Sequence, residues 1–398
     1  MAKIWTAWLA ISTAFLLALS GCTAAENTGG QGAAEGSDFP TVEIYNTQEE
    51  LLTTVEFSNA LFPVQDGIVY AKGSINESGN SDMEFHYYQW NSQEDKTLGA
   101  MENIAHITRD PVYADGHLYM YVLTGSLMGN GQLHLMDFDL AQGSMTEIFA
   151  EDNGDPYNTM TVQGDRLLMG KIEKKGIFLK EYNIKTGEQK TLLRFDFDES
   201  TDVGETIRGL DSDGETISLL MYVKETPESE VQLRLDVYDL DLNLLRSMDF
   251  SFVSSDENER RQAVSHFVSA GSTVYYENYS TTTFLGRVEG NRAEKIMETI
   301  EVEGMFTMAR ETEPNRETGI FVNAFNPENT LYRVDYATGR VEKAEFSPNE
   351  NEEILSVRRD GEDTLLIQMD ESGKNTSQDE KRKMYFVPLS ELEFEPFL

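Results

Sequence analysis

The chain is built from short runs in which apolar and polar residues alternate, and small turn clusters separate these runs. One run follows Asp66-Gly67 and another follows Asp115-Gly116. Alternation with a period of two predicts strands that bury one face, and an Asp-Gly pair between two apolar runs predicts a hairpin. Only Gln48 to Leu52 is expected to form a turn of helix. We therefore expect an all-β protein.

The turn clusters recur at a regular spacing. With one glycine of each cluster as a marker, the successive intervals are 49, 48, 50, 57, 48 and 42 residues, which define seven units. The markers are Gly67, Gly116, Gly164, Gly214, Gly271, Gly319 and Gly361. Repeats of this length indicate a protein assembled from one supersecondary unit used many times.

Each unit is expected to supply four short strands. In most units a second strand-and-turn signal follows the first, as in Leu135 to Gly143, Lys180 to Gly187 and Tyr332 to Gly339. A lone four-stranded sheet buries its two faces only by stacking on neighbours, so a ring of such sheets is predicted. The expected fold is a β-propeller of seven four-stranded blades, with six or eight also compatible with the intervals.

Closure of the ring is assigned to the first strand of the folded body. Thr41 to Tyr45 alternates like a strand but precedes the first marked unit, so we expect it to complete the blade formed by Ile354 to Leu398. The recurring Tyr70, Tyr119, Tyr275 and Phe321 belong to the strand pattern and are expected in the core. In their repeated units, residues 41 to 398 resemble bacterial β-propeller lipoproteins. The strand-Asp-x-x-Thr-Gly pieces are similar to those of pyrroloquinoline-quinone-type repeats, a resemblance that implies a scaffold and no activity.

The first residues have the order of an export signal. Lys3 precedes the apolar segment Trp5 to Leu19, which is too short for a stable membrane span. The tetrapeptide Leu19-Ser20-Gly21-Cys22 then resembles the lipobox of bacterial lipoproteins. The resemblance implies that residues 1–21 are removed as a signal peptide and that Cys22 carries the lipid. An ordinary secretory signal that happens to end near a cysteine is the alternative.

Residues 22–40 are expected to connect this lipid to the folded body at 41–398. They are rich in Gly, Ala, Ser and Thr and have no apolar period, which is typical of a flexible tether. A coil of about 18 residues spans roughly 25 Å, enough to hold the body clear of lipid headgroups. The expected location is the extracytoplasmic face of the cell membrane, with the membrane contacted through the lipid on Cys22. Whether the envelope has one membrane or two is left open.

Charge narrows the classes of partner. Without Lys3 the chain keeps 31 basic and 70 acidic residues, so 31 minus 70 gives a net charge of −39. Such a surface repels phosphate backbones, so nucleic acid is excluded as a partner. Cys22 is the only cysteine, so no intramolecular disulfide can form and stability is assigned to a large apolar core.

No motif of catalysis, metal binding or cofactor binding is found, and we expect no cofactor. The sequence has no Gly-x-Ser-x-Gly elbow, no His-Glu-x-x-His helix and no phosphate-binding glycine loop. The histidines, which show no ligand spacing, are His86, His106, His117, His134 and His266. The acidic run Asp211 to Glu215 suggests calcium but departs from the EF-hand spacing, so we interpret it as a hairpin turn.

One set of cationic residues is the candidate ligand site. Each lies just before a hairpin turn, on a segment interpreted as an inner strand, and together they represent five blades: Arg109, Arg208, His266, Arg310 and Arg358. Inner strands line the channel of a propeller, so these side chains are expected to gather at its mouth and attract a carboxylate, an acidic sugar or an acidic peptide. The alternative is that each forms an ion pair between blades or faces solvent.

The sequence leaves two classes of function. The first is a membrane-anchored binding or assembly module that presents a rigid ring to an envelope protein or glycan. The second is an envelope carbohydrate-active enzyme with a site in the propeller funnel. Because no catalytic constellation is found in the sequence, the binding module is favoured and enzyme activity is left open.

Overall fold

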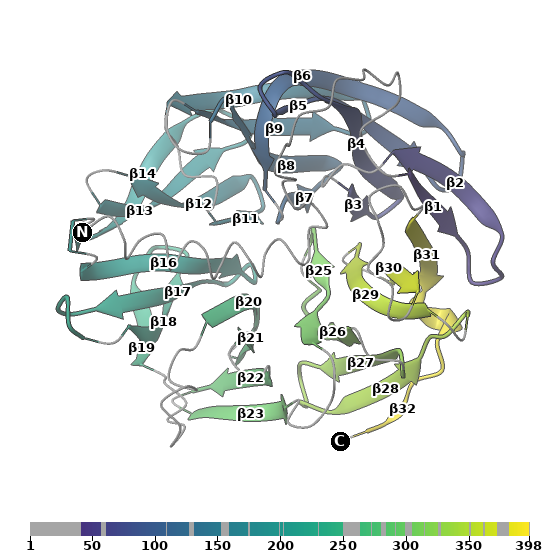
Figure 1. Cartoon of the computed structure of the whole chain (residues 1–398). Helices are drawn as coiled ribbons and strands as arrows, with labels where there is room; N and C mark the ends of the chain where they lie inside the picture. The colour runs from purple at the N-terminus through teal and green to yellow at the C-terminus, as the bar shows by residue number, and fades with distance from the viewer. Residues whose placement is uncertain are drawn as a thin grey trace.

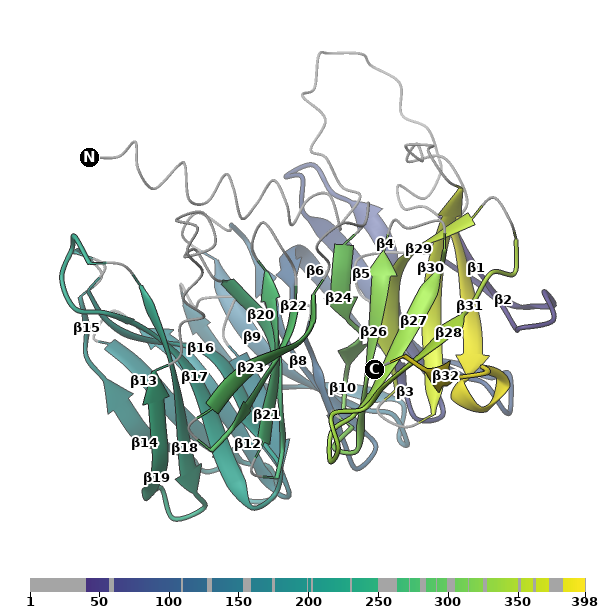
Figure 2. The same cartoon turned by 90° about the horizontal axis from the view of Figure 1, so that it is seen from below.

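The described strands form mainly antiparallel sheets arranged in a ring around a central axis (Figure 1). A computed structural model describes residues 41–397, apart from gaps at 57–60, 109, 127–130, 153–158, 174–175, 199, 202, 230, 250–262, 272, 280–283, 291, 299–304, 314, 325–327, 350–351, 361–362 and 372–381. The predicted signal peptide, Cys22 and the tether therefore lie outside the described residues. Figure 2 shows the ring from the side, with its strands running between the two faces.

The repeating unit is a meander of four strands that runs from the axis to the rim. The first two are β3 (Leu61–Val64), β4 (Gly67–Ile75), β5 (Ser81–Gln89) and β6 (Asp95–Ile107), then β7 (Val112–Ala114), β8 (His117–Thr124), β9 (Gln132–Asp139) and β10 (Ser144–Asp152). The next two are β11 (Thr159–Gln163), β12 (Arg166–Glu173), β13 (Gly176–Asn183) and β14 (Gln189–Phe195), then β16 (Val203–Ser212), β17 (Thr216–Lys224), β18 (Gln232–Asp239) and β19 (Leu244–Asp249).

The chain completes the ring with three more units. These are β20 (Ala263–Ala270), β21 (Thr273–Tyr279), β22 (Phe284–Glu289) and β23 (Arg292–Glu298), then β24 (Met305–Met308), β26 (Thr318–Ala324), β27 (Thr330–Asp335) and β28 (Val341–Glu345), then β29 (Glu352–Arg359), β30 (Thr364–Glu371) and β31 (Arg382–Pro388) with β1 (Thr41–Tyr45) and β2 (Leu51–Glu56). Short strands β15 (Phe197–Asp198), β25 (Arg310–Glu311) and β32 (Glu395–Pro396) extend three of these sheets, and Leu389–Glu391 forms a 3-10 turn.

This architecture is a β-propeller, as the repeats predict. The first two meanders share one eight-stranded sheet, because the start of the 13-residue β6 pairs with β5 and its end pairs with β8. The predicted seven blades require this sheet to be counted as two, so the blade count stays a prediction. Among the described residues, no helix is long and apolar enough to cross a membrane.

The core lies between neighbouring sheets, where the apolar face of each strand meets the next blade. Leu168 and Leu179, for example, pack with Leu219 and Met221 of the following sheet. Each such buried side chain contributes roughly 1.5–3 kcal/mol to folding. The aromatic positions expected in the core are all buried: Tyr70, Tyr119, Tyr275 and Phe321.

Ring closure follows the prediction: β1 pairs with β31 beside the last strands, in parallel, and so completes that sheet. β2 then pairs with the outer edge of β1, so the helical turn expected over Gln48 to Leu52 is wrong. The last strand, β32, pairs with β28 of the preceding sheet.

The sixth marker glycine does not lie in a hairpin turn as the sequence predicts. Gly319 lies inside β26, and the chain between β24 and β26 makes an excursion over residues 309–317. We call this the crossing segment, because it passes through the middle of the ring in Figure 1. Thr312 Oγ1 donates a hydrogen bond to the carbonyl of Pro63, and the N–H of Tyr113 donates to the carbonyl of Thr312. Residues of the crossing segment thus contact the inner strands of several other sheets.

Candidate functional site

The structure brings together only part of the predicted cationic set. Arg109 lies outside the described residues, and His266 lies on β20 opposite Glu277 in the strand register. Arg208 is exposed at a bulge of β16, with its guanidinium carbon 4.9 Å from the ring centre of Tyr222. Arg310 and Arg358 are neighbours, because β25 pairs in parallel with the inner strand β29.

Arg310 does not lie on an inner strand, contrary to the expectation from its position before a turn cluster. The inner strand of its sheet is β24, which ends at Met308. Arg310 instead belongs to the crossing segment and, as part of β25, pairs with the axial edge of the neighbouring sheet. The edge of β29 near Arg358 is therefore covered by backbone pairing.

Other chemical candidates are held by local partners. Asp213 Oδ1 accepts hydrogen bonds from the N–H groups of Glu215 and Thr216, which confirms the hairpin turn. His117 Nδ1 lies 2.8 Å from Asp137 Oδ1, and His134 Nδ1 lies 2.6 Å from Glu147 Oε2. Within the described residues, no group of three or more His, Cys, Asp or Glu residues is arranged to hold a metal ion.

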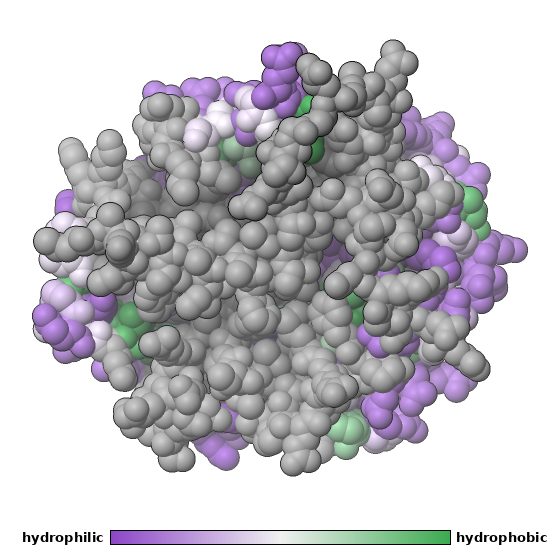
Figure 3. Space-filling view, in the orientation of Figure 1, coloured by the Kyte–Doolittle hydropathy of each residue, from purple (hydrophilic) through white to green (hydrophobic). Residues whose placement is uncertain are grey.

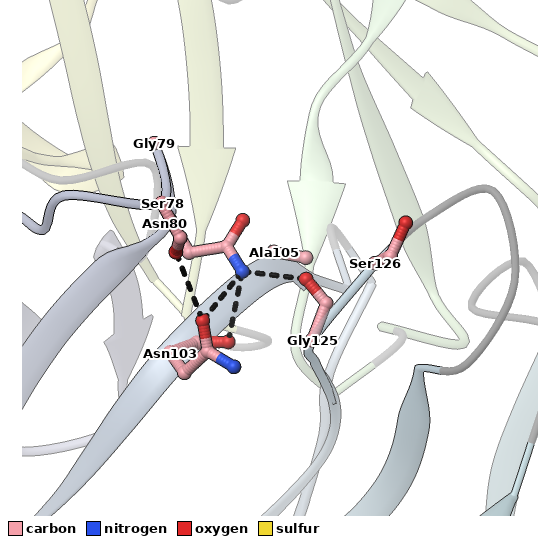
Figure 4. Close-up of a pocket in the computed structure, with 7 residues that line it drawn as sticks. All are labelled: Ser78, Gly79, Asn80, Asn103, Ala105, Gly125 and Ser126. Atoms are coloured by element: carbon pink, nitrogen blue, oxygen red, sulfur yellow. Dashed lines mark hydrogen bonds between the residues drawn. The ribbon is translucent and has the colours of Figure 1, made fainter.

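A polar cavity lies where β6 passes from one meander to the next. Its volume is about 520 Å³. The lining residues come from the β4–β5 turn, from β6 and from the residues just after β8: Ser78, Gly79, Asn80, Asn103, Ala105, Gly125 and Ser126 (Figure 4).

Backbone irregularities of β6 lie beside this cavity. The register of β6 shifts between Ser81 and Met83 of its first partner strand, and again between Ile104 and His106 of β6 itself. Asn103, which lies inside the first of these shifts, has a left-handed φ of 60°, a conformation that asparagine tolerates better than most residues. Two successive bulges bend the strand and leave room beside it.

A network of amide hydrogen bonds holds the lining in place. Asn80 Nδ2 donates to Asn103 Oδ1 at 2.7 Å and to the carbonyl of Gly125, and Ser78 Oγ donates to Asn103 Oδ1 at 3.2 Å (Figure 4). Asn80 Oδ1 and Asn103 Nδ2 are the other ends of these two side-chain amides, an acceptor and a donor respectively. Such a pair suits a hydroxyl group, which both donates and accepts.

Charge near the cavity favours a neutral ligand. The lining has no ionisable side chain, whereas Glu77 and Glu102, next to lining residues in the sequence, are exposed. Asp82, on β5, accepts hydrogen bonds from the N–H of the lining residue Asn103 and from Asn76 Nδ2. These bonds hold the pKa of Asp82 below its ordinary value, so it stays ionised and is a poor proton donor. Sequence reasoning missed this site, although the turn cluster Asn76 to Asn80 is its visible signal.

Around the rim of the ring, the residues that the structure describes are mainly hydrophilic (Figure 3). This agrees with a formal net charge of −38 for the whole chain. A cavity lined by neutral amides and hydroxyls is therefore a local exception to an acidic molecule.

Comparison with known proteins supports the β-propeller fold and assigns no function. The sequence matches no protein-family model and no curated protein. A solved structure that it resembles is the β-propeller domain of the trilobed protease from Pyrococcus furiosus. The TM-score is 0.53 at 10% identity, over 85% of this chain and 96% of that one.

Two further solved structures have TM-scores below 0.5. They are the periplasmic gluconolactonase PpgL from Pseudomonas aeruginosa, at 0.47 with 14% identity over 88% of this chain and 99% of that one, and an acylaminoacyl peptidase, at 0.46 with 11% identity over 67% of this chain. The chain spans only 43% of the length of that peptidase. At such identities the likeness concerns the scaffold, and one propeller scaffold serves many functions.

Proposed function

We propose that this protein is a membrane-anchored, extracytoplasmic β-propeller that binds a neutral glycan of the cell envelope. In this proposal residues 1–21 are removed, Cys22 carries the lipid, and residues 22–40 tether the propeller to the membrane surface. The observation that carries the glycan assignment is the cavity of about 520 Å³, lined by amide, hydroxyl and backbone groups. Hydroxyl-rich ligands are recognised by such neutral donors and acceptors.

The same lining favours binding over chemistry at this site. General acid–base catalysis needs a titratable group within hydrogen-bond reach of the reacting atom. The lining consists of Ser, Gly, Asn and Ala, and the nearby Asp82 accepts two hydrogen bonds that keep its pKa low. A glycan held here would be bound and presented, with no proton donor in the lining to start its cleavage.

The test is calorimetric titration of the Cys22→Ser chain with a panel of neutral oligosaccharides, alongside the variant Asn103→Asp. Aspartate keeps the Oδ1 acceptor for Asn80 and replaces the Nδ2 donor by a charged oxygen. The loss of one hydrogen bond and the new desolvated charge should weaken binding by at least about ten-fold, which corresponds to about 1.4 kcal/mol.

Asn183→Asp is the matched control. Asn183 Oδ1 accepts the N–H of Thr186 in a turn on another sheet, and aspartate can do the same. Equal affinity of the native chain and Asn103→Asp would place any glycan elsewhere. Release of shorter sugars during the titration would instead support a carbohydrate-active enzyme.

A further inference from the structure

Two arginines lie side by side at the centre of the ring. β25 and β29 pair in parallel, with Arg310 opposite Arg358 and Glu311 opposite Arg359. Residues opposite each other in a sheet project from the same face. Arg310 and Arg358 therefore share one face, and Glu311 and Arg359 share the opposite face. Like charges placed directly opposite each other destabilise a sheet, so this arrangement favours the binding of an anion between them.

The two faces differ in how closely one arginine of each, Arg359 or Arg310, approaches a carboxylate. On one face Arg359 Nη1 lies 3.3 Å from Glu311 Oε1, and both side chains are buried. On the other face Arg310 Nη1 lies 3.7 Å from Asp110 Oδ1, which is longer than a hydrogen bond. Arg358 lies there with its guanidinium carbon 5.3 Å from the ring centre of Phe62. Asp110 therefore holds Arg310 less tightly than Glu311 holds Arg359.

This second face is open to small solutes. The side chain of Arg310 is 33% exposed and that of Asp110 is 64% exposed. A guanidinium has five N–H donors in a planar fork, and the 3.7 Å contact with Asp110 leaves donors of Arg310 to spare. Two adjacent forks match the oxygens of a carboxylate or phosphate group, which accept charge-assisted hydrogen bonds from both.

We propose that Arg310 and Arg358 form a binding site for a small oxyanion within the ring, separate from the glycan cavity. The ligand group is a carboxylate or a phosphate, and Asp110 competes with it for Arg310. Arg109, adjacent to Asp110 in the sequence, lies outside the described residues and is not needed for the proposal. The site does not depend on the proposed glycan function, since none of its residues lines that cavity.

The experiment measures the thermal unfolding midpoint of the Cys22→Ser chain at graded concentrations of inorganic phosphate, succinate and chloride, at constant ionic strength. A ligand that binds only the folded chain raises the midpoint with concentration. The midpoint should rise with phosphate or succinate and not with chloride, and the more effective oxyanion identifies the preferred group. Arg310→Gln should abolish the rise.

Asp110→Asn provides a second, opposite result. It removes the competing carboxylate, so the same rise should occur at an oxyanion concentration about ten-fold lower. This gain keeps the proposal testable even if Arg310→Gln folds poorly. Arg292→Gln, an exposed arginine paired with Glu294 on the outer strand β23, is the control and should match the native chain. An equal response to all three salts, or no gain in Asp110→Asn, would overturn the proposal.

Discussion

At the scale of single residues, the centre of the ring depends on buried charges. Arg359 is among the largest fully buried side chains of the described residues. It bonds to Glu311 and to the carbonyl of Thr318. Arg316 makes two bonds to Asp211 and donates to the carbonyls of Ser212 and Ser269. Their forked donors satisfy carboxylates and backbone carbonyls together, which a lysine cannot do as well.

Glu311 should make stability depend on pH. Burial raises the pKa of Glu311 to about 7, although Arg359 and the N–H of Asn315 act to lower it. The unfolded chain loses this proton near the ordinary value of 4.5, so it binds fewer protons than the folded chain between these values. Stability contributed by this group should therefore fall as pH rises from about 4.5 to about 7.

The check is urea unfolding of Glu311→Gln across that pH range. The native chain should lose free energy of unfolding on the order of a few kcal/mol between the two ends of the range, and the variant should lack this decline. Glu317→Gln, an exposed residue of the same crossing segment, serves as the control. An unchanged slope in Glu311→Gln would mean that Arg359 keeps this carboxylate ionised throughout.

The sequence makes some of these residues visible and hides others. Arg310 and Arg358 stand out because both lie just before a turn cluster, and the structure shows that they are close. Arg316 and Arg359 do not stand out, because nothing local to the sequence says which arginine is buried. One sequence feature does mark the sixth unit as unusual: Thr318-Gly319 stands at the position where several other units have Asp-Gly.

At the scale of elements, alternation and turn residues predict most strands correctly. The hairpins at Asp66-Gly67, Asp115-Gly116 and Asp213-Gly214 fall where expected, because turn geometry is decided by a few local residues. The division of β6 between two meanders and the pairing of β25 with β29 could not be predicted. Both depend on which strands meet in the folded chain, and the asparagine-lined cavity lies where β6 passes from one partner strand to the other.

β1 offers a test of ring closure. Ile44 is fully buried and packs with residues of β31 and of the neighbouring sheet, so Ile44→Ala should lower the free energy of unfolding by about 2–5 kcal/mol. Leu51→Ala on β2 removes a side chain that is 53% exposed and should cost less than about 0.5 kcal/mol. Urea unfolding of both variants checks this, and equal costs would show that β1 does little to hold the ring.

At the scale of the whole molecule, the proposed lipid anchor works against the charge of the chain. Without residues 1–21 the net charge is 31 minus 70, or −39, which repels an anionic lipid surface, so the proposal assigns attachment to the lipid and not to the body of the ring. Cys22→Ser should therefore move the protein from the membrane fraction to the soluble extracytoplasmic fraction. Cell fractionation with immunoblotting measures this, with Thr23→Ser as the control. Retention of Cys22→Ser in the membrane fraction would point to another attachment, and a native chain that is already soluble would point to the ordinary secretory signal.

The pairing of β1 with β31 also sets the order in which the protein can fold. Residues 42–45 find their neighbours at 382–385, so the ring stays open until residues 382–385 have been synthesised. Contacts between such distant residues make folding slow, and the unclosed sheets expose strand edges that can aggregate. A ribosome-bound fragment of this chain should thus have no native state of its own. If the chain is exported as proposed, this delay keeps it unfolded long enough to pass through a narrow export channel. The ring then closes only after the chain has been released.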